Sequence, residues 1–183
     1  MARIIHSINA TLSGTCFHED VIADGEHHQY ATELARSADA LLLGRNTYDL
    51  FATFWPSAVH RNDLPDFVVS LAHVLTEKPK IVVSSSELNA SWKNTARIDC
   101  PERDSLHATL SNLKGKIVLF GSPSLAGSLA AQDLLDEAHV LLQPLFSTRG
   151  PQLPCLWREQ PLRNVSASRF MSGVVLLRYE AEA

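Results

Sequence analysis

The sequence predicts an α/β fold with a mixed central sheet that is mostly parallel, is flanked by helices and ends in an antiparallel ribbon. Short runs rich in β-branched residues alternate with stretches of helical periodicity, as in βαβ units. Two of these runs end in a glycine that opens a helix. The last two strand-like runs are joined by Met171-Ser172-Gly173, which is typical of a hairpin turn.

The first elements follow from periodicity and capping residues. An isoleucine-rich strand is expected at 4–9, and the stretch 10–25, which lacks periodicity, is expected to be a long loop. Loops of this length in compact domains are often functional. A helix is expected at 26–37 with Asp24 as its N-cap. Its buried stripe should consist of Tyr30, Leu34 and Ala38.

The next elements are placed by the same signals. The apolar run at 40–43 predicts a strand that is buried on both faces. A helix should follow Gly44 and end at Pro56, and another is expected around 67–75. Ser122 is expected to cap a helix that starts at Pro123. The remaining expected elements are a helix at 101–113 and strands at 80–84, 96–98, 116–120, 138–142, 165–170 and 174–179.

Composition limits the classes of protein. The chain has 183 residues and a mass of 20.2 kDa, with 45% hydrophobic and 20% charged residues. These values predict one globular domain over 1–183 and exclude a disordered, collagen-like or coiled-coil chain. The formal charge of −4 argues against a nucleic-acid partner. Because no apolar run could span a membrane and no leader pattern is present, a cytoplasmic protein is expected.

Cysteine and histidine spacing predicts no metal site. Cys16, Cys100 and Cys155 form no C-x-x-C pair, so neither a disulfide framework nor a zinc site is expected. His27 and His28 are adjacent on a predicted helix and should point apart, and no carboxylate pattern completes a site with them and His18.

Two strand-to-helix junctions are candidate ligand sites, LGRNT at 43–47 and FGSPS at 120–124. In open α/β sheets a ligand binds beyond the carboxyl ends of the strands, where glycine lets a phosphate approach the helix N–H groups. Arg45 would add a charge and a two-pronged donor. The alternative is an ordinary tight turn that needs no ligand. The sequence lacks G-x-G-x-x-G, Walker-type and G-x-S-x-G motifs, which argues against kinases and hydrolases.

The order and spacing of several short motifs resemble the RibD C-terminal domain family, the bacterial dihydrofolate-reductase-like reductases. The motifs are NATLSG at 9–14, LGRNTY at 43–48, WP at 55–56, KIVVSS at 80–85, GSPSL at 121–125, LDE at 135–137, QP at 143–144 and SGVV at 172–175. The resemblance covers essentially the whole chain. It implies a dihydrofolate-reductase-like three-layer fold, NADPH as cofactor and a homodimer.

The resemblance also implies roles for particular residues. Those expected at the cofactor are Gly44, Arg45, Asn46, Thr47, Ser84, Ser85, Gly121, Ser122, Ser124 and Leu125. Those expected at the substrate are Asn9, Thr11, Gly14, Phe51 and Trp55. His18 and Ser13 are the candidate catalytic residues. Ser13 stands where the family usually has an aspartate, and serine is a poor acid, so His18 is the better proton donor.

The leading hypothesis is an NADPH-dependent reductase of a small heterocyclic or carbonyl substrate. It would resemble the 5-amino-6-(5-phosphoribosylamino)uracil reductase of riboflavin biosynthesis and dihydrofolate reductase. The alternative is a non-catalytic dimer that binds a ligand or acts as a scaffold while keeping the fold.

Overall fold

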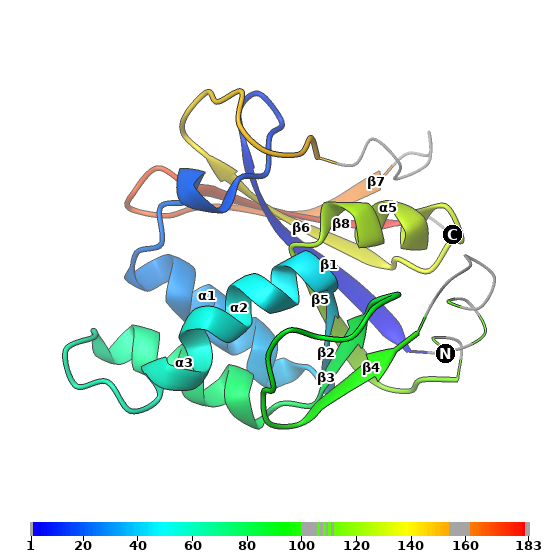
Figure 1. The fold of residues 1–183 in the computed structure, drawn as a ribbon. Coiled ribbons are helices and arrows are strands. Elements are labelled where there is room, and N and C mark those ends of the chain that lie inside the picture. The colour runs from blue at the N-terminus through cyan, green and yellow to red at the C-terminus, as the bar shows by residue number, and fades with distance from the viewer. Residues whose placement is uncertain are drawn as a thin grey trace.

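The computed structural model describes residues 2–99, 106, 108, 110, 112–153 and 162–181. Eight strands form one sheet in the order β4-β3-β2-β5-β1-β6-β8-β7 (Figure 1). All neighbours from β4 to β6 are parallel, whereas β8 is antiparallel to both β6 and β7. The strands are β1 (Arg3–Thr11), β2 (Ala40–Gly44), β3 (Lys80–Val83), β4 (Thr95–Ile98), β5 (Lys116–Phe120), β6 (Glu137–Gln143), β7 (Leu162–Arg169) and β8 (Val175–Ala181).

Helices cover both faces of this sheet, so the predicted three-layer fold is confirmed. The helices are α1 (Gly25–Ser37), α2 (Arg45–Ala58), α3 (Asp66–Glu77) and α5 (Pro123–Ala130), with a short 3-10 helix, η1 (His18–Asp20). Alternate residues of β2 show the layering: Leu41 and Leu43 pack with α1 and α3, while Leu42 packs with α5. This explains why the strand is apolar on both faces.

Several local predictions are confirmed and others need correction. Asp24 caps α1, because its carboxylate accepts a hydrogen bond from the His27 N–H at 2.9 Å. The expected stop at Pro56 is wrong: α2 continues to Ala58. A proline removes one helical N–H, and in the last turn this costs a single hydrogen bond. The stretch 10–25 is not wholly a loop, because β1 extends to Thr11 and η1 lies within it.

Two further predictions concern the second half of the chain. Most of the predicted helix at 101–113 lies outside the described residues, as do Cys100 and Cys155. The C-terminal hairpin is confirmed, with strands at Leu162–Arg169 and Val175–Ala181. The β4 strand, placed from only three residues of sequence, is also present at the sheet edge.

A buried lysine ties α3 to the sheet. Lys80, the first residue of β3, is only 1% exposed. Its ammonium donates to the backbone carbonyls of Leu75, Thr76 and Lys78 at 2.8, 3.0 and 2.8 Å, and it lies 4.4 Å from the centre of the Trp92 ring. Burial lowers the pKa of Lys80 to about 8. The side chain therefore satisfies carbonyls at the end of α3 that the helix itself leaves unpaired.

Replacing this lysine should destabilise the fold. We expect Lys80→Met to lower the free energy of unfolding by about 2–3 kcal/mol, because buried carbonyls lose their donor. Urea denaturation followed by circular dichroism measures the change. Lys93→Met is the matched control, since Lys93 pairs with Glu77 of the same helix but is largely exposed, and it should cost less than about 1 kcal/mol. Equal losses in the two variants would contradict this role of Lys80.

Candidate functional site

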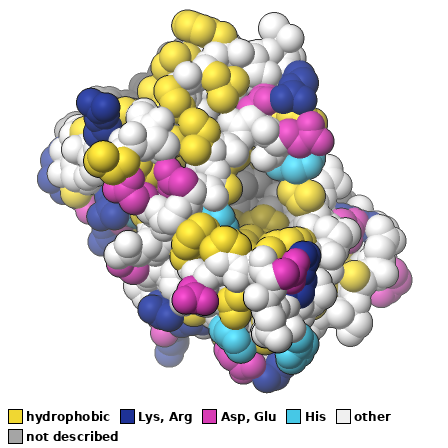
Figure 2. Space-filling model, turned by 90° about the vertical axis from the view of Figure 1, so that its left-hand side faces the viewer, with side chains coloured by type: hydrophobic (Ala, Val, Ile, Leu, Met, Phe, Trp, Pro, Cys, Tyr) yellow, Lys and Arg dark blue, Asp and Glu magenta, His cyan; other side chains and the backbone are white. Residues whose placement is uncertain are grey.

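A cleft of about 1160 Å³ opens at the carboxyl ends of the parallel strands. Its walls come from β1, β2, β5, α1, α2 and the start of α5, and Figure 2 shows it as a hollow bordered by hydrophobic side chains and histidines. This is where open α/β sheets bind ligands. The cleft brings together these predicted site residues: Asn9, His18, Gly44, Arg45, Asn46, Thr47, Phe51, Trp55, Gly121, Ser122, Ser124 and Leu125.

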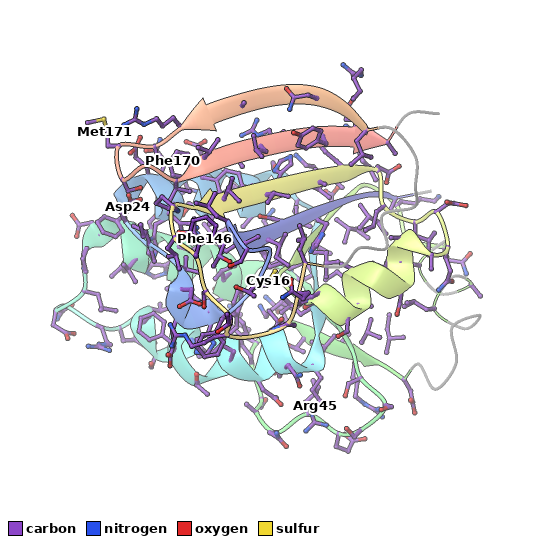
Figure 3. The ribbon with its side chains drawn as sticks, turned by 90° about the horizontal axis from the view of Figure 1, so that it is seen from above. Cys16, Asp24, Arg45, Phe146, Phe170 and Met171 are labelled. Carbon is purple, nitrogen blue, oxygen red and sulfur yellow. The ribbon has the colours of Figure 1, made fainter. Side chains whose placement is uncertain are left out.

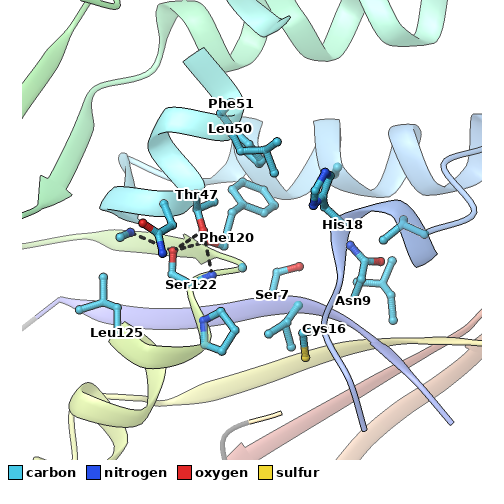
Figure 4. A pocket seen from close by; sticks show the side chains of 18 of the residues that line it. Ser7, Asn9, Cys16, His18, Thr47, Leu50, Phe51, Phe120, Ser122 and Leu125 are labelled. Atoms are coloured by element: carbon cyan, nitrogen blue, oxygen red, sulfur yellow. Dashed lines mark hydrogen bonds between the residues drawn. The ribbon is translucent and has the colours of Figure 1, made fainter. Parts of the chain in front are cut away.

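At one end of the cleft, the N-termini of α2 and α5 lie side by side. The Gly44 N–H donates to the Ser122 hydroxyl at 2.8 Å, and the Ser122 N–H donates to Thr47 Oγ1 at 3.1 Å (Figure 4). A Cβ on Gly44 would lie 3.2 Å from the Ser122 side chain, so glycine is needed for this close approach. The N-terminal residues of both helices thus line the same end of the cleft, which favours an anionic group.

Ser122 has an uncommon backbone conformation. Its φ of 53° and ψ of 58° are left-handed, as is the φ of 54° at Gly121. It occupies the N-cap position of α5 as predicted, but its side chain makes no capping hydrogen bond. The hydroxyl instead contacts Gly44 and Thr47 across the junction. We attribute the tolerated strain, about 1–2 kcal/mol for a non-glycine residue, to these bonds.

Arg45 extends from the start of α2 toward the segment after β3. Its guanidinium donates to Asp49 Oδ2 at 3.2 Å, to Asn89 Oδ1 at 2.9 Å and to the Ser86 hydroxyl. Ser84 and Ser85 precede Ser86 in the same segment but do not line the cleft. The structure therefore brings Arg45 to Ser86, whereas the expected Ser84 and Ser85 neither line the cleft nor contact Arg45 among the described residues.

A network of amide side chains lies at the other end of the cleft. The Ile22 N–H donates to Gln143 Oε1 at 2.9 Å, so the Gln143 amide nitrogen is the group that faces Asn9. That nitrogen donates to Asn9 Oδ1 at 3.0 Å, and His27 Nε2 lies 3.1 Å from the same oxygen. An oxygen can only accept, so His27 carries its proton on Nε2. The Asn9 Nδ2 has no hydrogen-bond partner among the described residues and is available as a donor in the cleft.

Histidines line the cleft beside this network. Burial lowers the pKa of His27 to about 4, and its Nδ1 is buried without a partner among the described residues. His28 contacts the rings of Phe67 and Trp55, and its Nδ1 lies 2.8 Å from the Asp24 carbonyl oxygen. From the sequence, His27 and His28 were candidates only for metal ligation, which their adjacency argued against. Both are instead part of the cleft wall.

Three further expected site residues also lie outside the cleft, at the end of β1 and in the turn that follows it. Ser13 accepts a hydrogen bond from the Ser147 N–H at 2.9 Å and contacts Thr11 Oγ1 at 3.1 Å. Gly14 has a φ of 79°, as the turn requires. Ser13, Thr11 and Gly14 therefore fasten the turn to the segment after β6. His18 lies on η1 at the rim, where it is exposed.

Sequence reasoning missed other residues that line the cleft. Ser7 lies two residues before Asn9 on β1, so both side chains point to the same face of the sheet. Polar residues two positions apart, which share one face of a strand, are the signal that could have identified Ser7. Tyr30 was expected only as part of the buried stripe of α1, and it is buried, but it also lines the cleft.

The described residues contain neither a candidate membrane span nor a cluster of metal ligands. None of the helices in the described part of the chain is long and apolar enough to cross a membrane. Within the same residues, no three side chains of His, Cys, Asp or Glu lie together as metal ligands would.

Known structures share this fold. A protein assigned to riboflavin biosynthesis from Shewanella sp. PV-4 matches over 100% of both chains, with 18% identity and a TM-score of 0.67. Dihydrofolate reductase from Enterococcus faecalis, complexed with NADP(H), has 12% identity and a TM-score of 0.64, and the match covers 99% of this chain and 97% of that one.

A third structure is larger. The diaminohydroxyphosphoribosylaminopyrimidine deaminase/5-amino-6-(5-phosphoribosylamino)uracil reductase of Thermotoga maritima has 15% identity and a TM-score of 0.64. The match covers 99% of this chain but only 57% of that one. No curated protein matches the chain in sequence. The RibD C-terminal domain family matches residues 1–176, nearly the full length. The chain therefore belongs to the RibD C-terminal domain family.

Proposed function

We propose that the protein is an NADPH-dependent reductase of a small heterocyclic substrate. The observation that carries this proposal is the pair of helix N-termini, α2 and α5, joined by the Gly44–Ser122 hydrogen bond at one end of the cleft. Two adjacent helix N-termini suit a pyrophosphate, which carries two phosphate groups. The cofactor, when bound, supplies the hydride.

The rest of the dinucleotide fits the same side of the cleft. Arg45 and the serine-rich segment after β3 provide donors beside the pyrophosphate position, where a 2′-phosphate could be recognised. The glycines at 44 and 121 let the two junctions pack closely, because a Cβ at either position would meet Ser122 or Thr47. The protein's own contribution is to bind and orient the cofactor and to hold the substrate against it.

Asn9 supports a substrate with a carbonyl group or an unprotonated ring nitrogen. Its side-chain oxygen is occupied by His27 and Gln143, so only the N–H donors remain for a ligand. A fixed donor in a buried site rejects analogues that lack the matching acceptor. Pyrimidinedione and pterin rings carry such acceptors. This agrees with the names of the similar structures, a uracil reductase and dihydrofolate reductase.

Turnover distinguishes this function from its alternative. NADPH oxidation would be followed with 5-amino-6-(5-phosphoribosylamino)uracil, dihydrofolate and simple aldehydes as candidate substrates. We expect NADPH to bind and a heterocyclic candidate to be reduced. Binding of NADPH without turnover of any candidate would favour a ligand-binding protein, and absence of NADPH binding would contradict the proposal.

Arg45 should distinguish NADPH from NADH. Because a hydrogen bond to a charged group contributes about 1.5–3 kcal/mol, Arg45→Ala should weaken NADPH binding about 10- to 150-fold. NADH binding should fall much less, since NADH lacks the 2′-phosphate. Fluorescence titration measures both dissociation constants. Arg61→Ala, which removes an exposed arginine paired with Asp63 outside the cleft, should change neither. Parallel losses for the two cofactors would assign Arg45 to the pyrophosphate.

Asn9→Asp should weaken substrate binding and leave cofactor binding unchanged. The carboxylate can still accept from His27 and Gln143, so the local network is kept. It replaces the free donor with a negative charge, and the KM for a carbonyl-bearing substrate should rise at least about tenfold. The dissociation constant of NADPH should stay unchanged. Asn112→Asp, on the exposed surface, is the control. An unchanged KM in Asn9→Asp would remove Asn9 from substrate recognition.

The protein is also proposed to be a homodimer. Its β7 edge strand exposes Val165. Phe146 and Met171, which lie at the end of the sheet where β7 turns into β8 (Figure 3), are 79% and 90% exposed. An unpaired edge beside apolar side chains favours a second copy. Light scattering should give twice the chain mass of 20.2 kDa, and Val165→Lys should weaken the dimer. A mass of one chain at micromolar concentration would contradict the proposal.

A further inference from the structure

A chain of hydrogen bonds leads from the cleft into the sheet. The hydroxyl of Ser7, on the floor of the cleft in Figure 4, lies 2.9 Å from the hydroxyl of Tyr30. The Tyr30 hydroxyl lies 2.9 Å from His139 Nδ1, and His139 Nε2 lies 2.7 Å from Glu137 Oε1. Arg3 holds the other oxygen of Glu137 at 2.9 Å. Polar groups from β1, α1 and β6 are thus joined in a single line.

The register of β1 against β6 and the position of α1 bring these groups together. Ser7 and His139 are directly paired in the parallel register of β1 and β6, and Tyr30 reaches them from α1. Ser7, Tyr30 and His139 are 4%, 8% and 4% exposed. Buried polar groups cost free energy unless they are paired, and apolar residues would fill the same space more cheaply. The arrangement therefore calls for a reason beyond packing.

The donors and acceptors of the chain can be assigned. Burial alone would raise the pKa of Glu137, but hydrogen bonds from His139 and Arg3 outweigh it and hold that pKa below its usual value. Ionised Glu137 can only accept, so His139 carries a proton on Nε2. Neutral His139 then accepts from Tyr30 through Nδ1, and Tyr30 accepts from Ser7. In this state Ser7 offers only lone pairs to the cleft.

We propose that Ser7, Tyr30 and His139 form a proton relay, in which His139, held against Glu137, stores the proton used in the cleft. The inference rests on the proposed function, because reduction of a carbon–nitrogen or carbon–oxygen double bond adds one hydride and one proton. The relay is a source for that proton. Ser7 is the residue that would touch the substrate, and Tyr30 and His139 act through it.

The proton balance closes without any other reactant than water. In loading, a water in the cleft gives a proton to Ser7 Oγ and leaves to solvent as hydroxide, the Ser7 proton moves to Tyr30, and the Tyr30 proton moves to His139 Nδ1. The result is an imidazolium beside the Glu137 carboxylate. In delivery, Ser7 gives its outer proton to the substrate atom, Tyr30 returns a proton to Ser7, and His139 Nδ1 returns one to Tyr30. His139 is neutral again and every bond is restored.

The histidines that line the cleft are less suited than His139 to store this proton. His18 is exposed, and no hydrogen bond from a described residue fixes its ring. His27 uses its Nε2 proton to orient Asn9. His139 has a carboxylate partner that stabilises its imidazolium. The titratable and charged groups around His139 are Glu137 on β6, Tyr30 on α1, Arg178 on β8, Lys116 on β5, and Arg3 and His6 on β1.

The pH dependence of turnover follows from the loaded state. Burial lowers the pKa of His139 more than Glu137 raises it. Because delivery requires the imidazolium, kcat should rise as the pH falls toward that pKa and decrease above it. Substitution of Tyr30 or His139, which act through Ser7, should change this pH profile without changing the affinity for NADPH.

Removal of the Tyr30 hydroxyl is the central experiment. With whichever substrate the wild type reduces, Tyr30→Phe should lower kcat about 100-fold with little change in KM, and the pH dependence should disappear. Ser7→Ala should do the same. Tyr48→Phe is the matched control, because Tyr48 is fully buried on α2 but bonds to the Ala90 carbonyl outside the cleft. NADPH affinity should be unchanged in all three variants.

Nuclear magnetic resonance tests the relay without turnover. In protein with ¹⁵N-labelled histidine, His139 should be neutral at pH 7 with its proton on Nε2 and a hydrogen-bonded Nδ1. Tyr30→Phe should shift the Nδ1 resonance downfield, and Tyr48→Phe should not. His139→Asn identifies the signals. This measurement stays valid even if the proposed function fails.

Other outcomes would overturn the relay. A Tyr30→Phe or Ser7→Ala variant that keeps its wild-type kcat and pH profile would do so. A loss in His18→Ala but not in Tyr30→Phe would assign the proton to His18 instead. An His139 that carries its resting proton on Nδ1 would contradict the bond directions on which loading and delivery depend.

Discussion

The hydrogen bond from the Gly44 N–H to the Ser122 hydroxyl joins the two strand-to-helix junctions from which the cleft is built. It requires glycine at 44, because a side chain there would press against Ser122. It also holds Ser122 in a left-handed conformation, which turns the chain from β5 into α5. The relative placement of the two helix N-termini, and with it the shape of the cleft end proposed to hold the pyrophosphate, depends on this contact.

The two ends of the cleft are built for different chemistry. One end presents backbone N–H groups and a guanidinium, which suit negative charge. The other presents an amide whose oxygen is already occupied, so it can only donate. Such a division suits the proposed occupants, a charged, extended cofactor and a small polar ring. The histidine-lined wall between Asn9 and Trp55 completes the second end.

Buried polar side chains serve two purposes in this fold. Lys80 completes the end of α3 and is a structural group, because its partners are backbone carbonyls. Ser7, Tyr30 and His139 bond to one another and lead to the cleft, so packing alone does not account for them. The difference lies in what each group faces. A donor aimed at helix carbonyls stabilises the fold, whereas a line of groups that can each give and take a proton can carry one.

The sequence by itself determined the fold class, most strands and helices, and the two strand-to-helix junctions that line one end of the cleft, because hydrophobic period and strand-end glycines are local signals. It also indicated that Arg45 would lie near the serines after β3, although the structure pairs Arg45 with Ser86 and not with Ser84 or Ser85. It placed Ser13, Thr11 and Gly14 at the substrate, whereas they fasten a turn outside the cleft. Only the tertiary structure revealed Ser7, His27 and His139, because their partners lie on other strands and helices. Register and side-chain direction across elements decide such contacts, and no local pattern in the chain encodes them.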